Sequence, residues 1–599
     1  MLFETVPGAG IEPARIAPLV FETSASTNSA IRAFPPVTTE WPLSVELCRL
    51  GNNTLFRVCK YSDKSESYKN CENRKKLVRF VLSFRNCLKF LGFFGTIHVH
   101  SHTIMRLILI NLAALLLCAG AHGAEIDRLV NKELSARGIP LSERCGDDVF
   151  LRRLYLVTTS RTPPPDIVRQ FLEDKSPDKR TKMIDKILAS DEYVENQVLK
   201  WGDLLRVKSE FSSNIWPNGV QAYNRWLMEQ LRDNTPYDVM VKNLLISTGS
   251  NFRSPAVNFY RINLERSPEV FLRDINQIFM GMRNYQGGSE PFFIQVSFKK
   301  TLEWKEEIVY LNIDKMPIPA ALPNGRKVEL KKGEDFRIPY AEWLVSNENP
   351  QFARTIVNRI WFWLMGVGIV EPADDFHDGN PPSNPELLNY LQRELVLHKY
   401  DLRHIFRIIL TSDAFSRASL SSAGNRDDDR YFSHYPTRRL SAEQLMDAVC
   451  DITGVPDNFS SRAPEPYTHF PRGTRATEIG DGSVTTSQLQ LFGRPSRDVS
   501  LESDRNNTLT FKQVIFLLNS SYVLNKLEQS PVVKALVDNN KNRSKLINEI
   551  YLTTLCRYPD AKEVSAVTSY AEENKLGSLK LAKNLMWALI NSDAFIFNH

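Results

Sequence analysis

The acidic loop of residues 371–378 holds the densest cluster of side chains that could do chemistry. Asp374, Asp375 and Asp378 offer hard oxygen ligands of the kind that Ca²⁺ prefers, and Asp375 with His377 has the types of an acid and a base. Asp side chains next to prolines also form turns by bonding to nearby backbone. The sequence predicts such a turn, with a Ca²⁺ site on the three aspartates and catalysis as alternatives.

Asn358 and Arg359 interrupt an otherwise apolar helix predicted over residues 356–370. An Arg inside such a helix requires a carboxylate partner, because an unpaired buried charge is costly. An ion pair with Asp374 or Asp375 is therefore predicted for Arg359, and a ligand-binding role is the alternative. Glu371, directly after the helix, belongs to the same polar cluster.

A second polar group, Glu502, Asp504 and Arg505, follows the loop of residues 492–497. These side chains could line a pocket, but a solvated, salt-bridged turn is the favoured interpretation. The aromatic stretch of residues 361–363 could stack on a sugar, although packing in the core is the more ordinary use of such residues.

Residues 125–599 contain no G-x-S-x-G, P-loop, H-E-x-x-H or dinucleotide-binding motif. Five histidines of this region show no local ligand spacing; they are His377, His398, His404, His434 and His469. The sequence therefore leans away from an enzyme without excluding a site assembled from distant residues. Adjacent carboxylates in the acidic loop would make a poor glycosidase pair, since the two groups must stand roughly 5–10 Å apart across the bond.

Residues 105–124 have the organisation of a secretory signal peptide. Met105 and Arg106 precede the apolar residues 107–117 and the small residues 118–124, and we favour cleavage after Gly123 or Ala124. The run is shorter than the roughly 20 apolar residues that a membrane-spanning helix needs. A secreted or periplasmic protein without a transmembrane span after cleavage is predicted.

A signal peptide cannot work from this internal position, so residues 1–104 are interpreted as upstream DNA translated from an early start codon. They show no sustained helical or strand period; a disordered extension is the alternative. His98, His100 and His102 alternate like metal ligands on a strand, but they lie in this leader.

Without leader and signal, basic and acidic side chains are equal in number. The charge gives no case for nucleic acid or an anionic membrane surface. Only Cys145, Cys450 and Cys556 then remain, which excludes a disulfide-stapled scaffold but allows one bridge.

The hydrophobic periods predict a mainly α, multi-helical two-domain protein with a small β insertion between the halves. The predicted parts are an N-terminal helical domain over 125–290, the β insertion over 291–337 and a C-terminal helical domain over 338–599. The C-terminal domain contains a loop over 457–508 and four closing helices over 510–591. Ser441 and Gln444 have the spacing of a capping box.

One pattern of six residues occurs twice, near the start and the end of the mature chain, in identical spacing. The first copy is Tyr155, Leu156, Thr158, Arg161, Pro163 and Val168, and the second is Tyr551, Leu552, Thr554, Arg557, Pro559 and Val564. Each copy continues to a Ser-Asp-x-aromatic ending. These residue types serve packing and capping, so the internal repeat predicts a structural frame rather than reaction chemistry.

The mature chain resembles the planctomycete-type exported proteins built from two paired domains of unknown function, the first nicknamed cytochrome-like. The resemblance is carried by residues 150–163, 179–204, 343–361, 371–385, 438–445, 492–495, 517–519 and 595–599. Many relatives have a C-x-x-C-H motif after the helix that matches residues 269–283. This chain has Asn284 to Gly288 there and no cysteine between Cys145 and Cys450, so covalent haem attachment is not expected.

A second departure lies at residues 501–505. Relatives often carry a Cys-Glu-Cys-Glu-Arg run there, whereas this chain reads Leu-Glu-Ser-Asp-Arg. The charges of that run are kept, but Leu501 and Ser503 replace the two cysteines, which are soft metal ligands.

These observations predict an exported cell-envelope protein with a binding or structural role, without haem, whose partner is an unknown envelope protein or polysaccharide. A hydrolase acting on extracellular glycans is one alternative. A degenerate relative of the c-type cytochrome-like electron-transfer proteins is the other.

Overall fold

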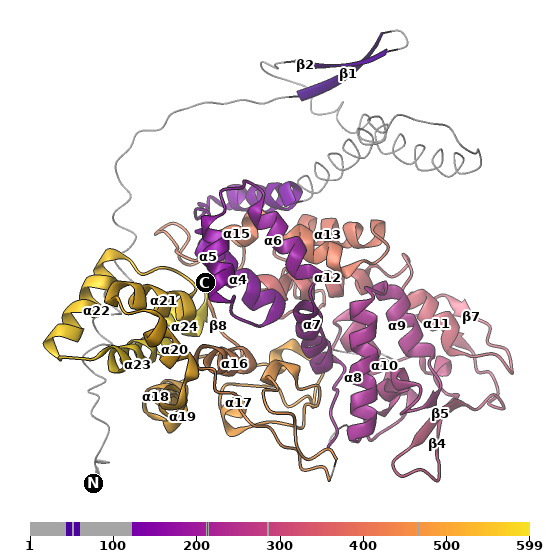
Figure 1. The fold of residues 1–599 in the computed structure, drawn as a ribbon. Coiled ribbons are helices and arrows are strands. Elements are labelled where there is room, and N and C mark those ends of the chain that lie inside the picture. The colour runs from indigo at the N-terminus through magenta and orange to yellow at the C-terminus, as the bar shows by residue number, and fades with distance from the viewer. Residues whose placement is uncertain are drawn as a thin grey trace, which may run out of the picture. The chain divides into compact units, whose positions relative to one another are not determined.

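The computed structural model describes residues 44–50, 53–59 and 123–599, apart from residues 211, 212, 214, 284–286 and 465 (Figure 1). Its contacts divide the chain into two units, one of residues 26–117 and one that contains residues 118–599. The predicted signal peptide up to residue 122 lies outside the described residues, and so do His98, His100 and His102.

In the smaller unit, β1 (Ser44–Leu50) and β2 (Asn53–Cys59) form an antiparallel pair in which Leu50 faces Asn53. The expectation that the leader has no strand period is wrong for these two segments. The missed signal is the Gly51-Asn52 dipeptide between two runs that contain β-branched and aromatic residues, which is typical of a hairpin.

The larger unit begins with helical residues 123–137 and continues as a run of amphipathic helices. Several start at the residue types that favour helix entry: the Ser190 hydroxyl accepts a hydrogen bond from the Tyr193 N–H, and Pro217 and Pro268 occupy first turns. The helices are α4 (Asp147–Thr159), α5 (Pro165–Glu173), α6 (Lys179–Leu188), α7 (Asp191–Leu204), α8 (Pro217–Arg232), α9 (Tyr237–Ile246) and α10 (Pro268–Met280), with the 3₁₀ helix η3 (Pro255–Arg261) before α10.

The β insertion forms two small sheets. In the first, the central strand β5 (Glu307–Leu311) pairs antiparallel with β3 (Gly249–Ser250) and β4 (Val296–Lys300). In the second, β6 (Ala320–Ala321) pairs with β7 (Lys327–Val328). The first residues of the predicted β insertion are not a strand, because Glu290–Phe292 form the 3₁₀ helix η4 ahead of β4.

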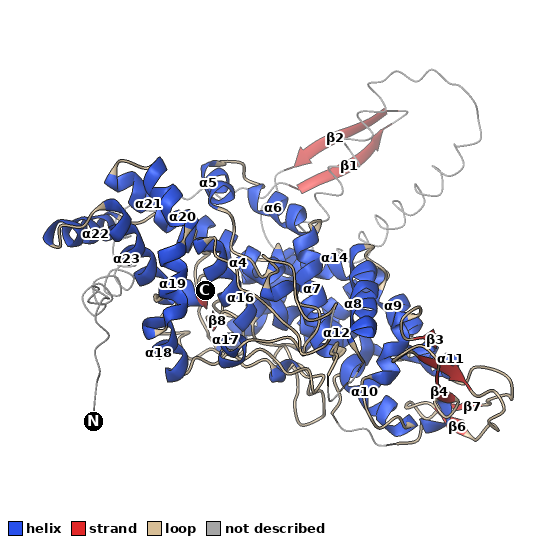
Figure 2. Ribbon diagram, turned by 60° about the horizontal axis from the view of Figure 1, so that its bottom comes forward, coloured by secondary structure: helices blue, strands red, loops and turns tan. Residues whose placement is uncertain are grey.

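The second half is again helical, with short helices inside the predicted loop of residues 457–508 (Figure 2). Its first elements are α11 (Arg337–Leu344), α12 (Pro350–Met365), α13 (Pro385–Leu397), α14 (Leu402–Leu410), α15 (Asp413–Ser416), β8 (Arg438–Arg439), α16 (Ala442–Thr453), η5 (Ala476–Glu478), α17 (Ser487–Leu491) and η6 (Glu502–Asp504). The predicted capping box of α16 is confirmed: the Gln444 N–H donates to the Ser441 hydroxyl, and the Ser441 N–H donates to the Gln444 side chain.

The number of closing helices is higher than predicted. Residues 510–591 form six helices instead of four, because Ser520 and the Ser530-Pro531 pair break the helical run. The elements are α18 (Phe511–Asn519), α19 (Ser521–Gln529), α20 (Pro531–Asn539), α21 (Arg543–Leu555), α22 (Ala561–Glu573) and α23 (Ser578–Ile590), followed by α24 (Asp593–Ile596) and β9 (Phe597–Asn598). Strand β9 pairs with β8.

Two hydrophobic cores fill this unit, and the predicted boundary at residue 337 does not separate them. The first core takes its residues from 126–435 and adds Leu552 and Cys556. The second takes Leu156 and residues from 440–596. Helix α12 is the reason: it is buried on most of its surface and packs against α10, α13 and α14, so the first helices of the second half belong to the N-terminal core.

The two copies of the repeated pattern occupy corresponding places. Helices α4 and α21 both end at a residue in the left-handed conformation, Ser160 and Cys556, and each is followed by a Pro-containing turn and another helix. Among residues 123–599, Cys145, Cys450 and Cys556 are free, and Cys145 and Cys556 are buried. In the described residues, no helix is long and apolar enough to cross a membrane.

Candidate functional site

A cavity of about 220 Å³ lies where α4, α7, α12, β8 and the segment around η6 meet. Larger hollows of about 440 and 530 Å³ exist elsewhere, but Lys200 and Glu502, a partly buried cation and a partly buried acid, lie in the wall of this one. The polar side chains of its wall are Ser160, Asn196, Lys200, Asp203, Arg438, Arg439, Ser441, Gln444, Glu502, Arg505, Asn507 and Asn598.

Lys200 enters this cavity from α7. Its ammonium lies 5.4 Å from the centre of the Trp363 ring, a favourable cation–π distance. In the part of the chain that the structure describes, the Lys200 ammonium forms no hydrogen bond or ion pair. Burial lowers its pKa below the ordinary value, and the Glu502 carboxylate partly offsets that effect. The Lys200 ammonium can therefore donate its hydrogen bonds to a ligand or to water in the cavity.

Glu502 supplies the opposing acid. Its Oε1 accepts a hydrogen bond of 2.8 Å from the Trp363 ring N–H, which fixes the side chain against α12. Burial raises the pKa of this carboxyl, and the negative charge of Asp374 adds to the rise. The backbone N–H of Glu502 donates to Asp374 Oδ2 at 2.6 Å, so Asp374 also fixes where η6 begins.

A network of buried charges forms one wall. Arg505 bridges Glu443 and Asp203, at 2.5 Å from Glu443 Oε2 and 2.6 Å from Asp203 Oδ2. Arg497 Nε lies 2.8 Å from the second oxygen of Asp203, and Arg494 lies 3.6 Å from Glu443. Burial acts to raise the pKa of Glu443, but Arg505 and Arg494 outweigh it and hold the pKa at about 2.

Two amide oxygens in the wall complete the set of unused polar atoms. Asn507 Oδ1 and Asn598 Oδ1 are buried and accept no hydrogen bond within the described chain. In contrast, Asn196 and Gln444 are used by the protein: Asn196 Nδ2 donates to Val157 O, and Gln444 Nε2 donates to Leu156 O. The wall therefore combines the Lys200 ammonium and the Glu502 carboxyl with two buried amide oxygens.

Arg438 fixes the far end of α12. Its guanidinium donates to the carbonyls of Phe362 and Trp363 in the last turn of the helix, and its charge complements the helix dipole. Arg438 therefore positions Trp363, whose ring forms part of the cavity wall.

The ion pair predicted inside the apolar helix is present. Arg359 Nη2 lies 2.5 Å from Asp374 Oδ1, and both side chains are buried. Asn358 pairs with both backbone groups of Val370. The Glu371 carboxylate accepts from the Gly368 N–H at 2.7 Å. These residues fold the chain around the end of α12, and of this group Asp374 alone is linked to the cavity, through Glu502.

The rest of the acidic loop lies apart from the cavity wall. Asp375 is 3.5 Å from Arg283 and 4.0 Å from the exposed His377, while Asp378 is exposed. Because Arg359 and the Glu502 N–H occupy both oxygens of Asp374, a Ca²⁺ ion here would depend on Asp375 and Asp378. The Ca²⁺ site stays a prediction.

The second polar group predicted from the sequence does not lie at the cavity as a whole. Glu502 and Arg505 line the cavity, whereas Asp504 does not and has a pKa raised by burial. Trp361 is buried in the core as predicted, whereas Phe362 and Trp363 also line the cavity.

Lys200 and Asp203 were not predicted as site residues, although their spacing in the sequence indicates a shared polar face. Asn196, Lys200 and Asp203 recur at intervals of four and three residues, which places them on one face of a helix whose other positions are largely apolar. Glu443 gave no such signal, because the residues one helical turn further along α16, Met446 and Asp447, offer no opposite charge.

The prediction that the histidines have no local ligand spacing is wrong for His398. Glu394 precedes His398 by one helical turn, and the fold adds His404 to the pair.

Two family models match the chain. Residues 125–283 match PSCyt2, a protein of unknown function (DUF1549), and residues 336–571 match PSD1, a protein of unknown function (DUF1553). The chain therefore carries the domains of two planctomycete-type families of unknown function. No curated protein and no solved structure matches it. Lys200 and Asp203 lie in the first matched region and Trp363, Arg438 and Glu502 in the second, so the cavity draws on both.

Proposed function

We propose that this protein is an exported, haem-free binding protein of the cell envelope, and that its ligand occupies the cavity around Lys200. The observation that carries this proposal is the Lys200 ammonium, which faces a cavity without a hydrogen-bond partner in the described chain. A charged group in that position is costly unless a ligand or water satisfies it.

The ligand class follows from the unused polar atoms. Lys200 favours an anionic group, while Asn507 Oδ1 and Asn598 Oδ1 accept hydrogen bonds from hydroxyls. A volume of about 220 Å³ is below the roughly 300–1,000 Å³ typical of sites for drug-sized ligands. The best match is a sugar acid of monosaccharide size, such as a hexuronate, free or at the end of an envelope polysaccharide.

Calorimetric titration of the purified protein with glucuronate and galacturonate tests this proposal. We expect binding of at least one hexuronate and much weaker binding of glucose, which lacks the carboxylate. Lys200→Met should weaken binding by roughly tenfold or more, since a hydrogen bond to a charged group contributes about 1.5–3 kcal/mol. Lys580→Met, which removes an exposed helical lysine, is the matched control. Equal affinity of the Lys200→Met variant would overturn the assignment.

Glycan hydrolysis is the second candidate function, supported by the raised pKa of Glu502, a property of general acids. Asp203, the other acid of the cavity wall, is held by Arg497 and Arg505, which weakens its case as a nucleophile. Release of reducing sugar from uronate-containing polysaccharides, abolished by Glu502→Gln, would establish this function.

Export and the lack of haem belong to the same proposal. Mass spectrometry of the protein recovered from outside the cytoplasm should give a first residue at Ala124 or Glu125, and a haem stain should be negative. A mass that begins before residue 105, or a haem band, would contradict the proposal.

A further inference from the structure

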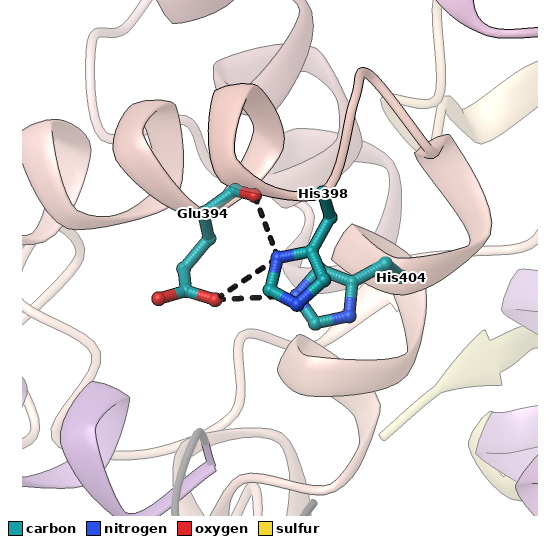
Figure 3. Close-up of side chains that lie close together, drawn as sticks. All are labelled: Glu394, His398 and His404. Carbon is teal, nitrogen blue, oxygen red and sulfur yellow. Dashed lines mark hydrogen bonds and ion pairs between the residues drawn. The ribbon is translucent and has the colours of Figure 1, made fainter. Parts of the chain in front are cut away.

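Three potential metal ligands converge at the turn between α13 and α14 (Figure 3). Glu394 Oε2 lies 3.5 Å from His398 Nδ1 and 3.3 Å from His404 Nε2. All three ligand atoms lie within 4.8 Å of one another. This group is separate from the acidic loop and from the wall of the 220 Å³ cavity.

The fold fixes the positions of these side chains. Glu394 and His398 stand one turn apart at the end of α13, so they share a helix face. Lys399 and Tyr400 adopt left-handed conformations that reverse the chain. Asp401 then caps α14 by accepting a hydrogen bond from the His404 N–H, which brings His404 back to Glu394.

The spacing agrees with tetrahedral zinc coordination. Bonds of about 2.0 Å from zinc to nitrogen and oxygen place neighbouring ligand atoms about 3.3 Å apart. The two measured separations from Glu394 Oε2, 3.3 and 3.5 Å, are close to that value. Imidazole nitrogens with a carboxylate select zinc-like ions over Ca²⁺ and Mg²⁺, which prefer oxygen ligands.

The two imidazole rings lie nearly parallel, with their centres 3.5 Å apart. As the rings stand, His398 Nδ1 donates a hydrogen bond to the Glu394 backbone carbonyl, 2.9 Å away (Figure 3). A shared ion requires the His398 ring to give up this bond, carry its proton on Nε2 and turn so that the lone pair of Nδ1 points at the metal. His398 is free of the core on one side, with 40% of its side chain exposed, whereas Glu394 is 9% exposed. The buried carboxylate thus provides a fixed anionic ligand, and the exposed histidine can adjust.

We propose that Glu394, His398 and His404 bind one Zn²⁺ ion through Oε2, Nδ1 and Nε2, with the remaining coordination position open to solvent. The ion would compensate the charge of the buried Glu394 carboxylate and tie the end of α13 to the start of α14. This site is independent of the proposed sugar-acid site, so either proposal can fail without the other.

Titration of the tag-free, chelator-treated full chain with ZnCl₂ tests the proposal by calorimetry. We expect one equivalent to bind, and replacement of the zinc by Co²⁺ should give the intense visible bands of a tetrahedral ion. His404→Gln and His398→Gln should each weaken binding at least tenfold. His434→Gln, which changes a histidine outside the cluster, should leave the affinity unchanged.

Two outcomes would overturn the site. One is the absence of zinc binding by the wild-type protein. The other is unchanged affinity in the His398→Gln/His404→Gln double variant, which would place the ion on other residues such as the leader histidines. Circular dichroism of each variant shows whether the fold persists. Glu394→Asp keeps the negative charge but moves the carboxylate oxygen away from the two histidines, so weaker zinc binding by this variant shows that the oxygen is a ligand rather than only a balancing charge.

Discussion

At the residue scale, the strongest constraint is the Glu443 carboxylate. It is completely buried between Arg494 and Arg505, and these cations hold its pKa at about 2. Glu443→Gln would leave Arg494 without its anionic partner and Arg505 with Asp203 alone. Since breaking a buried ion pair typically costs about 3–5 kcal/mol, we expect a loss of that size in the free energy of unfolding, measured by urea denaturation.

The lowered pKa of Glu443 predicts that the free energy of unfolding depends on pH. A folded-state pKa of about 2, below the ordinary value of 4.5, means that the ion pair stabilises the protein above pH 4.5 and that this contribution is lost as the pH falls toward 2. Other carboxylates titrate in this range, so the relevant quantity is the difference between wild type and Glu443→Gln. That difference should shrink on acidification; a constant difference would contradict the assignment. Glu572→Gln, at an exposed pair with Arg543, is the matched control.

At the element scale, α16 is held at its first turn by two kinds of contact. Ser441 and Gln444 cap the helix, and Gln444 also donates to Leu156 O and the Ser160 hydroxyl at the end of α4. Ser441→Ala should therefore cost about 1 kcal/mol, the usual value of an N-cap. Gln444→Ala should cost more, because it also removes the bonds to α4. Denaturation midpoints of the two variants measure this, and an equal loss would mean that the contacts to α4 contribute nothing.

At the scale of the whole molecule, the two matched regions share one hydrophobic core. Tyr237 stacks on Phe352 at 4.6 Å between ring centres, and Trp201 meets Trp363 edge-on at 6.3 Å. A fragment of residues 125–290 would expose the faces that α12 covers. We expect this fragment to lack fixed tertiary structure, seen as poor dispersion in its NMR spectrum, whereas the chain from residue 125 to 599, in which α12 covers these faces, should have fixed side-chain packing, seen in its near-UV circular dichroism. A well-dispersed spectrum of the fragment would show that the N-terminal region is an independent domain.

Local patterns in the sequence predicted the local features of this protein. The helical class, the small sheets, the capping box at Ser441 and the buried partner of Arg359 all depend on residues within about 15 positions of one another, where periodicity and capping chemistry apply. The count of closing helices was wrong because single Ser and Pro residues decide where adjacent helices break.

Short-range spacing specifies which segments are helices, and the cost of burying an unpaired charge specifies which charges need partners, so both can be predicted from neighbouring residues. The contacts between distant residues come from the fold. It joined Lys200 to Glu502 across one cavity, brought His404 to Glu394, and placed α12 in the N-terminal core, since packing of long-separated helices is set by the shapes of whole faces rather than by neighbouring residues.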